Sequence, residues 1–262
     1  MTIDAGAISW RFFRVWKRNL VTYQRIWKVN FITPLLEPLF YVTAFGLGFA
    51  GLIGDVVYGG THMSYVRYIA PALLAAAVMN NAFFETTYTS FVRMYYQNTF
   101  DGILATPISL EEVIVAEIVW AATKATGAAV VMLTVLGLFG LVTFPGALMV
   151  VPLAFFGGLA FASVGMFFTG IIPTIDMFNL PVFLFITPMF LFSGTFFPVS
   201  NLPAWARPLA LAFPLHHLVE LFRRFCVGTH ETATWISLTY LSVFLVAFVL
   251  LALMSMKRRL IQ

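Results

Sequence analysis

The chain has 262 residues, of which 61% are hydrophobic, 17% aromatic and only 10% charged. Soluble domains carry about a quarter of charged residues, so this composition excludes a soluble protein and indicates an all-α integral membrane protein. The formal charge of +4 does not indicate a nucleic-acid groove, because six of the fifteen Lys and Arg residues precede Thr33 and three lie in the last six positions. We expect these cations to contact membrane lipid, and we expect no nucleic acid as a partner.

Residues 1–32 are predicted to form a cytoplasmic amphipathic helix. Six cations share one side of its helical wheel: Arg11, Arg14, Lys17, Arg18, Arg25 and Lys28. Aromatic and aliphatic side chains occupy the other side. Such a helix is expected to lie in the headgroup plane, with its aromatic face in the lipid. The stretch Met1–Leu20 lacks the order of charged, apolar and small residues that marks a cleaved signal peptide.

Residues 33–262 are predicted to form a single transmembrane domain. A crossing needs about 20 mostly apolar residues, and five stretches qualify: 34–53, 69–88, 113–136, 147–171 and 235–256. A sixth stretch, 180–192, is short. Both ends of the chain are rich in Lys and Arg, however, which places both termini in the cytoplasm and requires an even number of crossings. The sequence therefore predicts six transmembrane helices.

Before the last crossing, prolines and glycines divide residues 193–228 into helical pieces too short to span. We expect a re-entrant segment on the outer side, which is tolerated only where it is buried against protein or lines a cavity. Four residues are predicted to line or cap an exit there: Ser193, Gly194, Thr195 and Asn201.

A metal site at His216 and His217 is not expected, because neighbouring side chains on a helix diverge and no third ligand has a suitable spacing. The only cysteine, Cys226, excludes an internal disulfide and a thiolate metal cluster.

The polar interruption between Arg93 and Glu112 is longer than a connection between antiparallel helices requires. Ser109 and Glu112 form the Ser-x-x-Glu pattern of a capping box, which predicts a new helix from about Leu110. The excess length favours docking of a cytosolic protein, with Ser109 and Glu112 as a stiff joint. The predicted contact residues are Asn98, Thr99, Phe100, Asp101, Gly102, Ile103 and Leu104. Phe100, Ile103 and Leu104 are the expected apolar anchors.

Charged residues inside a membrane are functional candidates, because burying one costs at least ~2.5 kcal/mol at mid-bilayer. The candidates for a transport path or a buried charge are Glu37, Glu85, Glu117 and Lys124. Glu37 and Glu85 could equally lie hydrated near the cytoplasmic interface. Glu117 and Lys124 are two helical turns apart on one face, so we expect them to pair through water or a third group.

No catalytic residue is predicted. The lysines are Lys17, Lys28, Lys124 and Lys257, and none precedes Ser or Thr, so the chain has no P-loop and is not itself an ATPase. Asp101 and Asp176 stand alone, so no pair of aspartates is available to hold a metal and a sugar diphosphate.

Several motifs between about Arg18 and Arg259 are specific when taken together: Glu37-Pro38, Gly46-Leu47-Gly48, Phe84-Glu85-Thr86, residues 104–110, 116–125, 158–163 and 187–194. They resemble the motifs of ABC-2 type transport permeases, most of all the NodJ-like branch that exports nodulation lipo-oligosaccharides. The resemblance implies six crossings, a homodimer with the conduit at its interface, and two cytosolic ATP-binding subunits that dock on the loop after the second crossing. No cofactor is expected on this chain, since ATP and Mg would bind to those partner subunits.

We therefore expect the permease subunit of an ABC exporter in a bacterial inner membrane. Its cargo would be an amphiphilic glycoconjugate, either a lipo-oligosaccharide or a polysaccharide, moved outward from the cytoplasmic side. Two other functions remain open on the sequence: a membrane-embedded enzyme that acts on a lipid-linked sugar, and an ion-coupled carrier that uses Glu37, Glu85 and Lys124.

Overall fold

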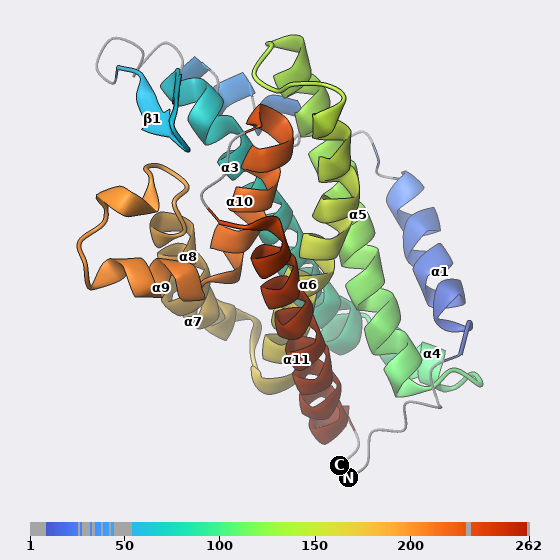
Figure 1. The fold of residues 1–262 in the computed structure, drawn as a ribbon. Coiled ribbons are helices and arrows are strands. Elements are labelled where there is room, and N and C mark those ends of the chain that lie inside the picture. The colour runs from blue at the N-terminus through green and yellow to red at the C-terminus, as the bar shows by residue number, and fades with distance from the viewer. Residues whose placement is uncertain are drawn as a thin grey trace.

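The computed structural model describes residues 9–25, 27, 32, 35–37, 39–41, 43–44, 54–228 and 232–260. They form a helical bundle with one small β-hairpin (Figure 1), which confirms the predicted all-α membrane fold. Five of the described helices are long and apolar enough to cross a membrane: Tyr65–Tyr96, Leu110–Leu138, Gly146–Ile171, Ile175–Phe192 and Thr234–Leu260. Most of the predicted crossing 34–53 lies outside the described residues, so a sixth crossing stays a prediction.

The elements follow one another in this order: α1 Phe12–Arg25, β1 Val56–Tyr58, β2 Thr61–Met63, α3 Tyr65–Phe84, α4 Thr99–Leu104, α5 Leu110–Leu138, α6 Val150–Ile171, α7 Asn179–Pro181, α8 Thr187–Phe192, α9 Ala206–Ala212, α10 Pro214–Val227 and α11 Thr234–Leu260. Two π-helical turns, Glu85–Thr89 and Val92–Tyr96, extend α3 beyond the predicted end at residue 88. A further π-helical turn joins α7 to α8, so the short predicted crossing 180–192 belongs to a longer helix.

Helix α6 lies at the centre of the bundle and contacts α3, α5, α10 and α11. Its glycines permit this close packing. A Cβ added to Gly158 would lie 3.0 Å from the Cα of Ala122, and one added to Gly165 would lie 2.7 Å from the carbonyl oxygen of Phe83. Small residues at such positions let membrane helices approach closely, where van der Waals contact is the main attraction.

One end of the bundle holds α4, the beginning of α5 and the last turns of α11 (Figure 1). At that end Glu111 forms an ion pair with Lys257, and Glu112 accepts hydrogen bonds from Ser9. The hairpin of β1 and β2 lies at the opposite end. This arrangement brings the described N-terminal and C-terminal segments to the same side of the bundle.

Helix α1 differs from the expected interfacial helix. It runs along the first half of α5 (Figure 1), with Val15 and Asn19 buried. The indole Nε1–H of Trp16 donates a hydrogen bond to Thr123 Oγ1 at 3.1 Å, and the Tyr23 ring packs edge-on against Trp120. The prediction that the aromatic face lies in lipid is therefore wrong for these two side chains, because they pack against protein instead.

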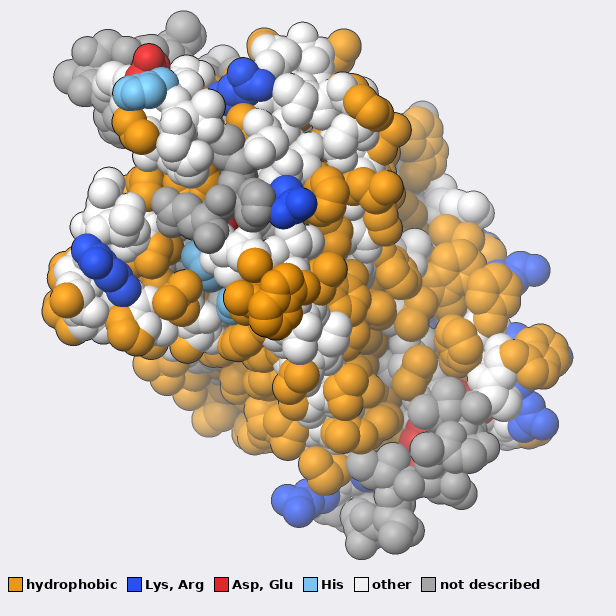
Figure 2. Space-filling view, in the orientation of Figure 1, with side chains coloured by type: hydrophobic (Ala, Val, Ile, Leu, Met, Phe, Trp, Pro, Cys, Tyr) orange, Lys and Arg blue, Asp and Glu red, His pale blue; other side chains and the backbone are white. Residues whose placement is uncertain are grey.

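The segment 193–228 contains the short helical pieces predicted for it, α9 and α10 among them. Helix α10 is largely buried between α3 and α11 rather than lying among outer headgroups. On the face of the molecule seen in Figure 2, hydrophobic side chains cover the middle and most Lys and Arg side chains lie toward the rim. That distribution suits a bundle surrounded by lipid.

Candidate functional site

Four charged side chains meet where α3 passes into its π-helical turns beside the first half of α5. We call them the inner charge cluster: Glu85, Arg93, Glu117 and Lys124. Glu85 and Arg93 lie in the two π-helical turns, and the other two lie on α5. Glu85 is 3% and Glu117 0% exposed. A buried carboxylate without partners would strongly destabilise the fold, so the partners of these two decide what the site can do.

Glu85 accepts from three different side chains. Its Oε1 accepts from Arg93 Nη1 and Trp120 Nε1, each at 3.0 Å. Its Oε2 accepts from Lys124 Nζ at 2.8 Å. Two cations and one indole thus surround a single carboxylate, which compensates its charge and fixes its orientation.

Glu117 is surrounded in a similar way. Its Oε1 accepts from Asn19 Nδ2 of α1 at 2.8 Å. Its Oε2 accepts from Ser90 Oγ at 2.6 Å and from Arg93, through Nε at 3.1 Å and through Nη2. Arg93 therefore bridges both carboxylates, and Asn19 connects α1 to the inner charge cluster.

The predicted pairing of Glu117 with Lys124 is wrong. Lys124 pairs with Glu85, and Glu117 pairs with Arg93, because each carboxylate finds a cation on the neighbouring helix rather than two turns along its own. Sequence reasoning missed Arg93 by ending the helix at residue 88. A π-helical turn takes up about one more residue than an α-helical turn, so eight residues after Glu85 the chain returns to the same face.

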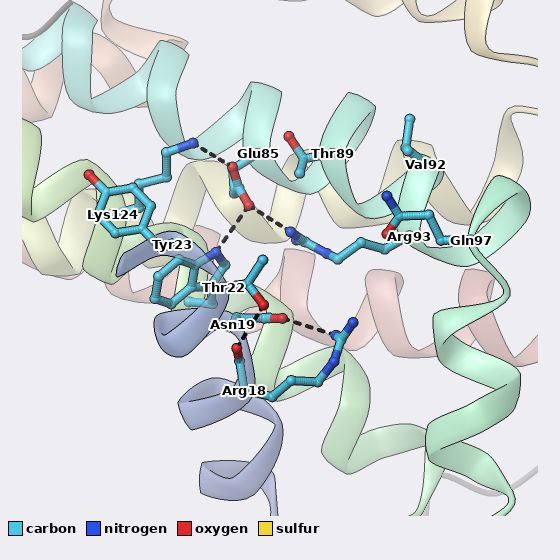
Figure 3. Close-up of a pocket in the computed structure, with 11 residues that line it drawn as sticks. Arg18, Asn19, Thr22, Tyr23, Glu85, Thr89, Val92, Arg93, Gln97 and Lys124 are labelled. Atoms are coloured by element: carbon cyan, nitrogen blue, oxygen red, sulfur yellow. Dashed lines mark hydrogen bonds and ion pairs between the residues drawn. The ribbon is translucent and has the colours of Figure 1, made fainter. Parts of the chain in front are cut away.

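A cavity of about 250 Å³ opens beside the inner charge cluster, between α1, the π-helical turns and α5 (Figure 3). Its lining contains Glu85, Arg93, Lys124 and Trp120 together with residues of α1. A second hollow, of about 380 Å³, includes Glu85, Thr89 and Lys124 as well, and is otherwise lined by Asn80, Asn81, Phe84 and Tyr88. The Glu85–Lys124 ion pair therefore contributes to both.

The connection from α3 to α5 contains α4 and the predicted capping box. Glu112 N–H donates to Ser109 Oγ at 3.3 Å, and Ser109 N–H donates to Glu112 Oε2 at 2.8 Å. The capping box is thus confirmed, and α5 begins at Leu110 as expected. The N-terminal segment holds the same connection, since Ser9 donates to Glu112 and Arg11 donates to Pro107 O at 2.7 Å.

The burial of Phe100 contradicts the predicted docking surface. Its side chain is fully buried in the hydrophobic core, so it is not accessible as an anchor for another protein. Ile103 and Leu104 are half-buried against the same core. An amphipathic helix of six residues has one apolar face, and here the bundle covers it.

The exposed part of the connection is more polar than predicted. Asn98, Asp101 and Gly102 are exposed, whereas Thr99 and Ser109 are half-buried. Tyr95 and Tyr96, which sequence reasoning did not single out, are 61% and 60% exposed. Tyrosine is enriched at protein interfaces, and the sequence offered this signal in Tyr95-Tyr96.

Glu37 lies apart from the inner charge cluster. Its Oε1 accepts a hydrogen bond from Tyr41 OH at 3.3 Å, one turn further along. The structure thus brings three of the four predicted membrane charges together and leaves the fourth elsewhere.

A second group of buried polar residues lies toward the hairpin end, and we call it the outer charge cluster: Tyr58, Tyr68, Glu220 and Arg223. Glu220 accepts from Tyr58 OH and lies 3.7 Å from Arg223. Arg223 donates to the carbonyl oxygens of Gly194, at 2.6 Å, and Tyr68, at 3.3 Å. Its guanidinium lies 3.9 Å from the centre of the Tyr68 ring.

Of the predicted exit residues, Ser193 and Thr195 are buried and only Asn201 is exposed, so the first two do not line an open exit here.

The ring nitrogens of the two neighbouring histidines, His216 and His217, lie against protein groups. His217 Nδ1 lies 3.2 Å from Ser237 Oγ and its Nε2 lies 3.0 Å from Leu211 O, so both ring nitrogens are engaged. Burial, and after it the neighbouring His216, lowers the pKa of His217 to about 4. Within the described residues, no group of three or more His, Cys, Asp or Glu side chains is placed to hold a metal ion.

Comparison with known proteins agrees with the architecture. The family model of the ABC-2 type transporter matches residues 11–227. The chain is 31% identical over 261 residues to Nodulation protein J of Rhizobium leguminosarum bv. viciae, covering 100% of this chain and 98% of that protein. It is 34% identical over 222 residues to Nodulation protein J of Bradyrhizobium diazoefficiens, covering 84% and 82%. It is also 24% identical to the inner membrane transport permease YadH of Escherichia coli, over 90% and 91% of the two chains.

These matches run through the charge-bearing helices and the capped connection, and with the five described membrane helices they support a multi-pass protein of the inner membrane. The chain belongs to the ABC-2 type transporter family, as a membrane permease.

Proposed function

We propose that this chain is the permease subunit of an ABC exporter that moves an amphiphilic glycoconjugate outward from the cytoplasmic side. The preferred cargo is a lipo-oligosaccharide, since relatives that match nearly the whole chain carry the name Nodulation protein J; a polysaccharide is the second choice. A separate ATP-binding subunit supplies the energy and holds ATP and Mg. Both termini lie in the cytoplasm.

The observation that carries the proposal is the connection between α3 and α5. Its exposed residues face outward, while Glu112 and Pro107 hold it to the N-terminal segment and the capping box holds it to α5. A force applied to this connection would therefore reach α1 and α5 together. Docking at Tyr95, Tyr96, Asp101 and Gly102 replaces the anchors predicted from the sequence.

The proposed assembly is a homodimer with two ATP-binding subunits. Only 22% of the most apolar part of helix Ile175–Phe192 is buried within the chain, against 83% for helix Tyr65–Tyr96. Phe183 and Leu184 are 68% and 76% exposed. An apolar face of this kind can contact either lipid or a second copy, and the second copy would enclose the conduit.

Co-purification tests the docking surface. The full chain with Asp101→Arg or Tyr96→Ala is expressed with its ATP-binding subunit, and the ratio of the two proteins is measured after affinity purification. We expect about a tenfold lower ratio with each variant, because one central contact residue often supplies that much affinity. Asn201→Arg, at an exposed position between α8 and α9, is the control. Unchanged ratios in both loop variants would refute docking at this connection.

A further inference from the structure

The cavity beside the inner charge cluster has an imbalance between hydrogen-bond donors and acceptors. Both carboxylates already accept from three side chains each: Glu85 from Arg93, Lys124 and Trp120, and Glu117 from Arg93, Asn19 and Ser90. Their oxygens are directed at these donors. A ligand that needed acceptors would therefore find few of them here.

Donors, by contrast, are abundant in this cavity. The ammonium of Lys124 has three N–H groups and lies 2.8 Å from one carboxylate oxygen. The guanidinium of Arg18 donates to two neutral oxygens, Asn19 Oδ1 at 3.2 Å and Thr99 Oγ1 at 3.4 Å. Among the described residues no carboxylate forms an ion pair with Arg18. Figure 3 shows Arg18 and Lys124 on two sides of the cavity, with the side chains of Gln97 and Tyr23 also drawn into its lining.

The charges in this region do not cancel. Arg18, Arg93 and Lys124 are three cations against the two carboxylates of the inner charge cluster, so these five groups carry a net charge of +1. Partial burial is the main cause that lowers the pKa of Arg18 from its ordinary value; the Glu117 carboxylate opposes this shift and the Arg93 guanidinium adds to it. An anion in the cavity would restore the balance.

We propose that this cavity binds the phosphate group of an anionic membrane phospholipid, held by Arg18 and Lys124. Arginine and lysine are the usual ligands of phosphate in proteins, and about 250 Å³ accommodates a phosphate diester. A lipid is favoured over a soluble phosphate because Val21, one turn from Arg18, and Trp27 are 45% and 52% exposed on α1. Those surfaces lie where acyl chains would pack. The site is separate from export and does not depend on which cargo is moved.

Lipid retention by the full chain tests the proposal. Wild type, Arg18→Gln and Arg25→Gln are purified from nanodiscs that contain phosphatidylcholine with or without phosphatidylglycerol, and bound lipid is counted by native mass spectrometry. We expect Arg18→Gln to retain about tenfold less phosphatidylglycerol than wild type, the change that one charge-assisted contact typically makes. Arg25→Gln removes the same charge from an exposed position of α1 and should retain the wild-type amount.

Inorganic phosphate distinguishes the source of the group. If phosphate alone, at millimolar concentration, raises the melting temperature of wild type but not of Arg18→Gln, and phosphatidylglycerol has no effect, the site takes soluble phosphate and the lipid assignment is overturned. Equal lipid loss in Arg18→Gln and Arg25→Gln would reduce the effect to general surface charge and refute the site. Gln97→Leu removes a hydrogen-bond donor from the cavity lining without changing the net charge. It is the test variant if Arg18→Gln does not fold. It should lower retention about threefold, and unchanged retention would refute the site.

Discussion

The inner and outer charge clusters contain similar residues, but these residues do different things in the two places. In both, an arginine joins a carboxylate inside a membrane protein. Arg93 bridges two carboxylates beside an open cavity, whereas Arg223 is directed at Glu220 and at backbone carbonyls and is 2% exposed. A cation that borders a cavity is accessible to a ligand. A cation enclosed by carbonyl groups is not accessible and can only hold the segments that carry those carbonyl groups together.

The difference shows that a buried charge in a membrane protein is not sufficient to identify a functional site. Arg223 donates to the carbonyl oxygen of Gly194, just after the end of α8, and to that of Tyr68 in α3, and Tyr68 OH also donates to Gly194 O at 3.0 Å. These bonds hold the interrupted segment after α8 to α3, as non-helical backbone inside a bilayer requires. We therefore infer a structural role for the outer charge cluster, whereas the inner one borders the ligand site that we propose. Four predictions sharpen or break this distinction.

The largest effect is expected from Arg223→Met. It leaves the buried Glu220 carboxylate with less compensation and removes the donors to two carbonyl groups, so folding stability should fall by about 3–5 kcal/mol. Thermal unfolding in detergent measures it, with Arg258→Met, exposed at the end of α11, as the control. A melting temperature equal to that of the control would contradict the structural role.

Arg93→Met should cost less, about 2–3 kcal/mol, because Lys124 still pairs with Glu85 and because Asn19 and Ser90 still donate to Glu117. Adding Glu117→Gln should recover part of this loss, since the second change removes one unpaired charge. The measurement is again thermal unfolding, together with the yield of monodisperse protein. Strictly additive losses would mean that Arg93 and Glu117 do not interact.

A double-mutant cycle on Lys124 separates the two carboxylates. Lys124→Met combined with Glu85→Gln should give a coupling of about 1 kcal/mol, whereas Lys124→Met combined with Glu117→Gln should be additive within about 0.5 kcal/mol. Stability of each single and double variant is measured under the same conditions. A larger coupling with Glu117 would reinstate the pairing expected from the sequence.

Ser109→Ala should have the smallest effect on folding, about 1 kcal/mol of local stability at the beginning of α5. Amide hydrogen exchange across Leu110–Val113 should report faster opening there and unchanged exchange in α10. Faster exchange in both helices would show that the cap affects the whole bundle rather than the connection alone.

The sequence predicted the membrane class, four of the five described crossings nearly to their ends, and the capping box, because hydrophobic length and cap chemistry are local properties. It did not predict the partners of Glu117 and Lys124, since pairing depends on π-helical turns that only the packed bundle reveals. It also led to the wrong prediction that Phe100 is exposed as an anchor for another protein. A short amphipathic helix has one apolar face, and the sequence does not say whether the core or another protein covers it.

The central claim is that this permease moves its cargo only when a separate ATP-binding subunit acts on the connection after α3. The most direct measurement is ATP-dependent movement of a fluorescent lipo-oligosaccharide across proteoliposomes that contain the permease with or without that subunit. We predict movement with ATP and both proteins, none with the permease alone, and at least a tenfold reduction with Asp101→Arg, corresponding to about 1.4 kcal/mol. Movement by the permease alone, or driven by a proton gradient without ATP, would contradict the account.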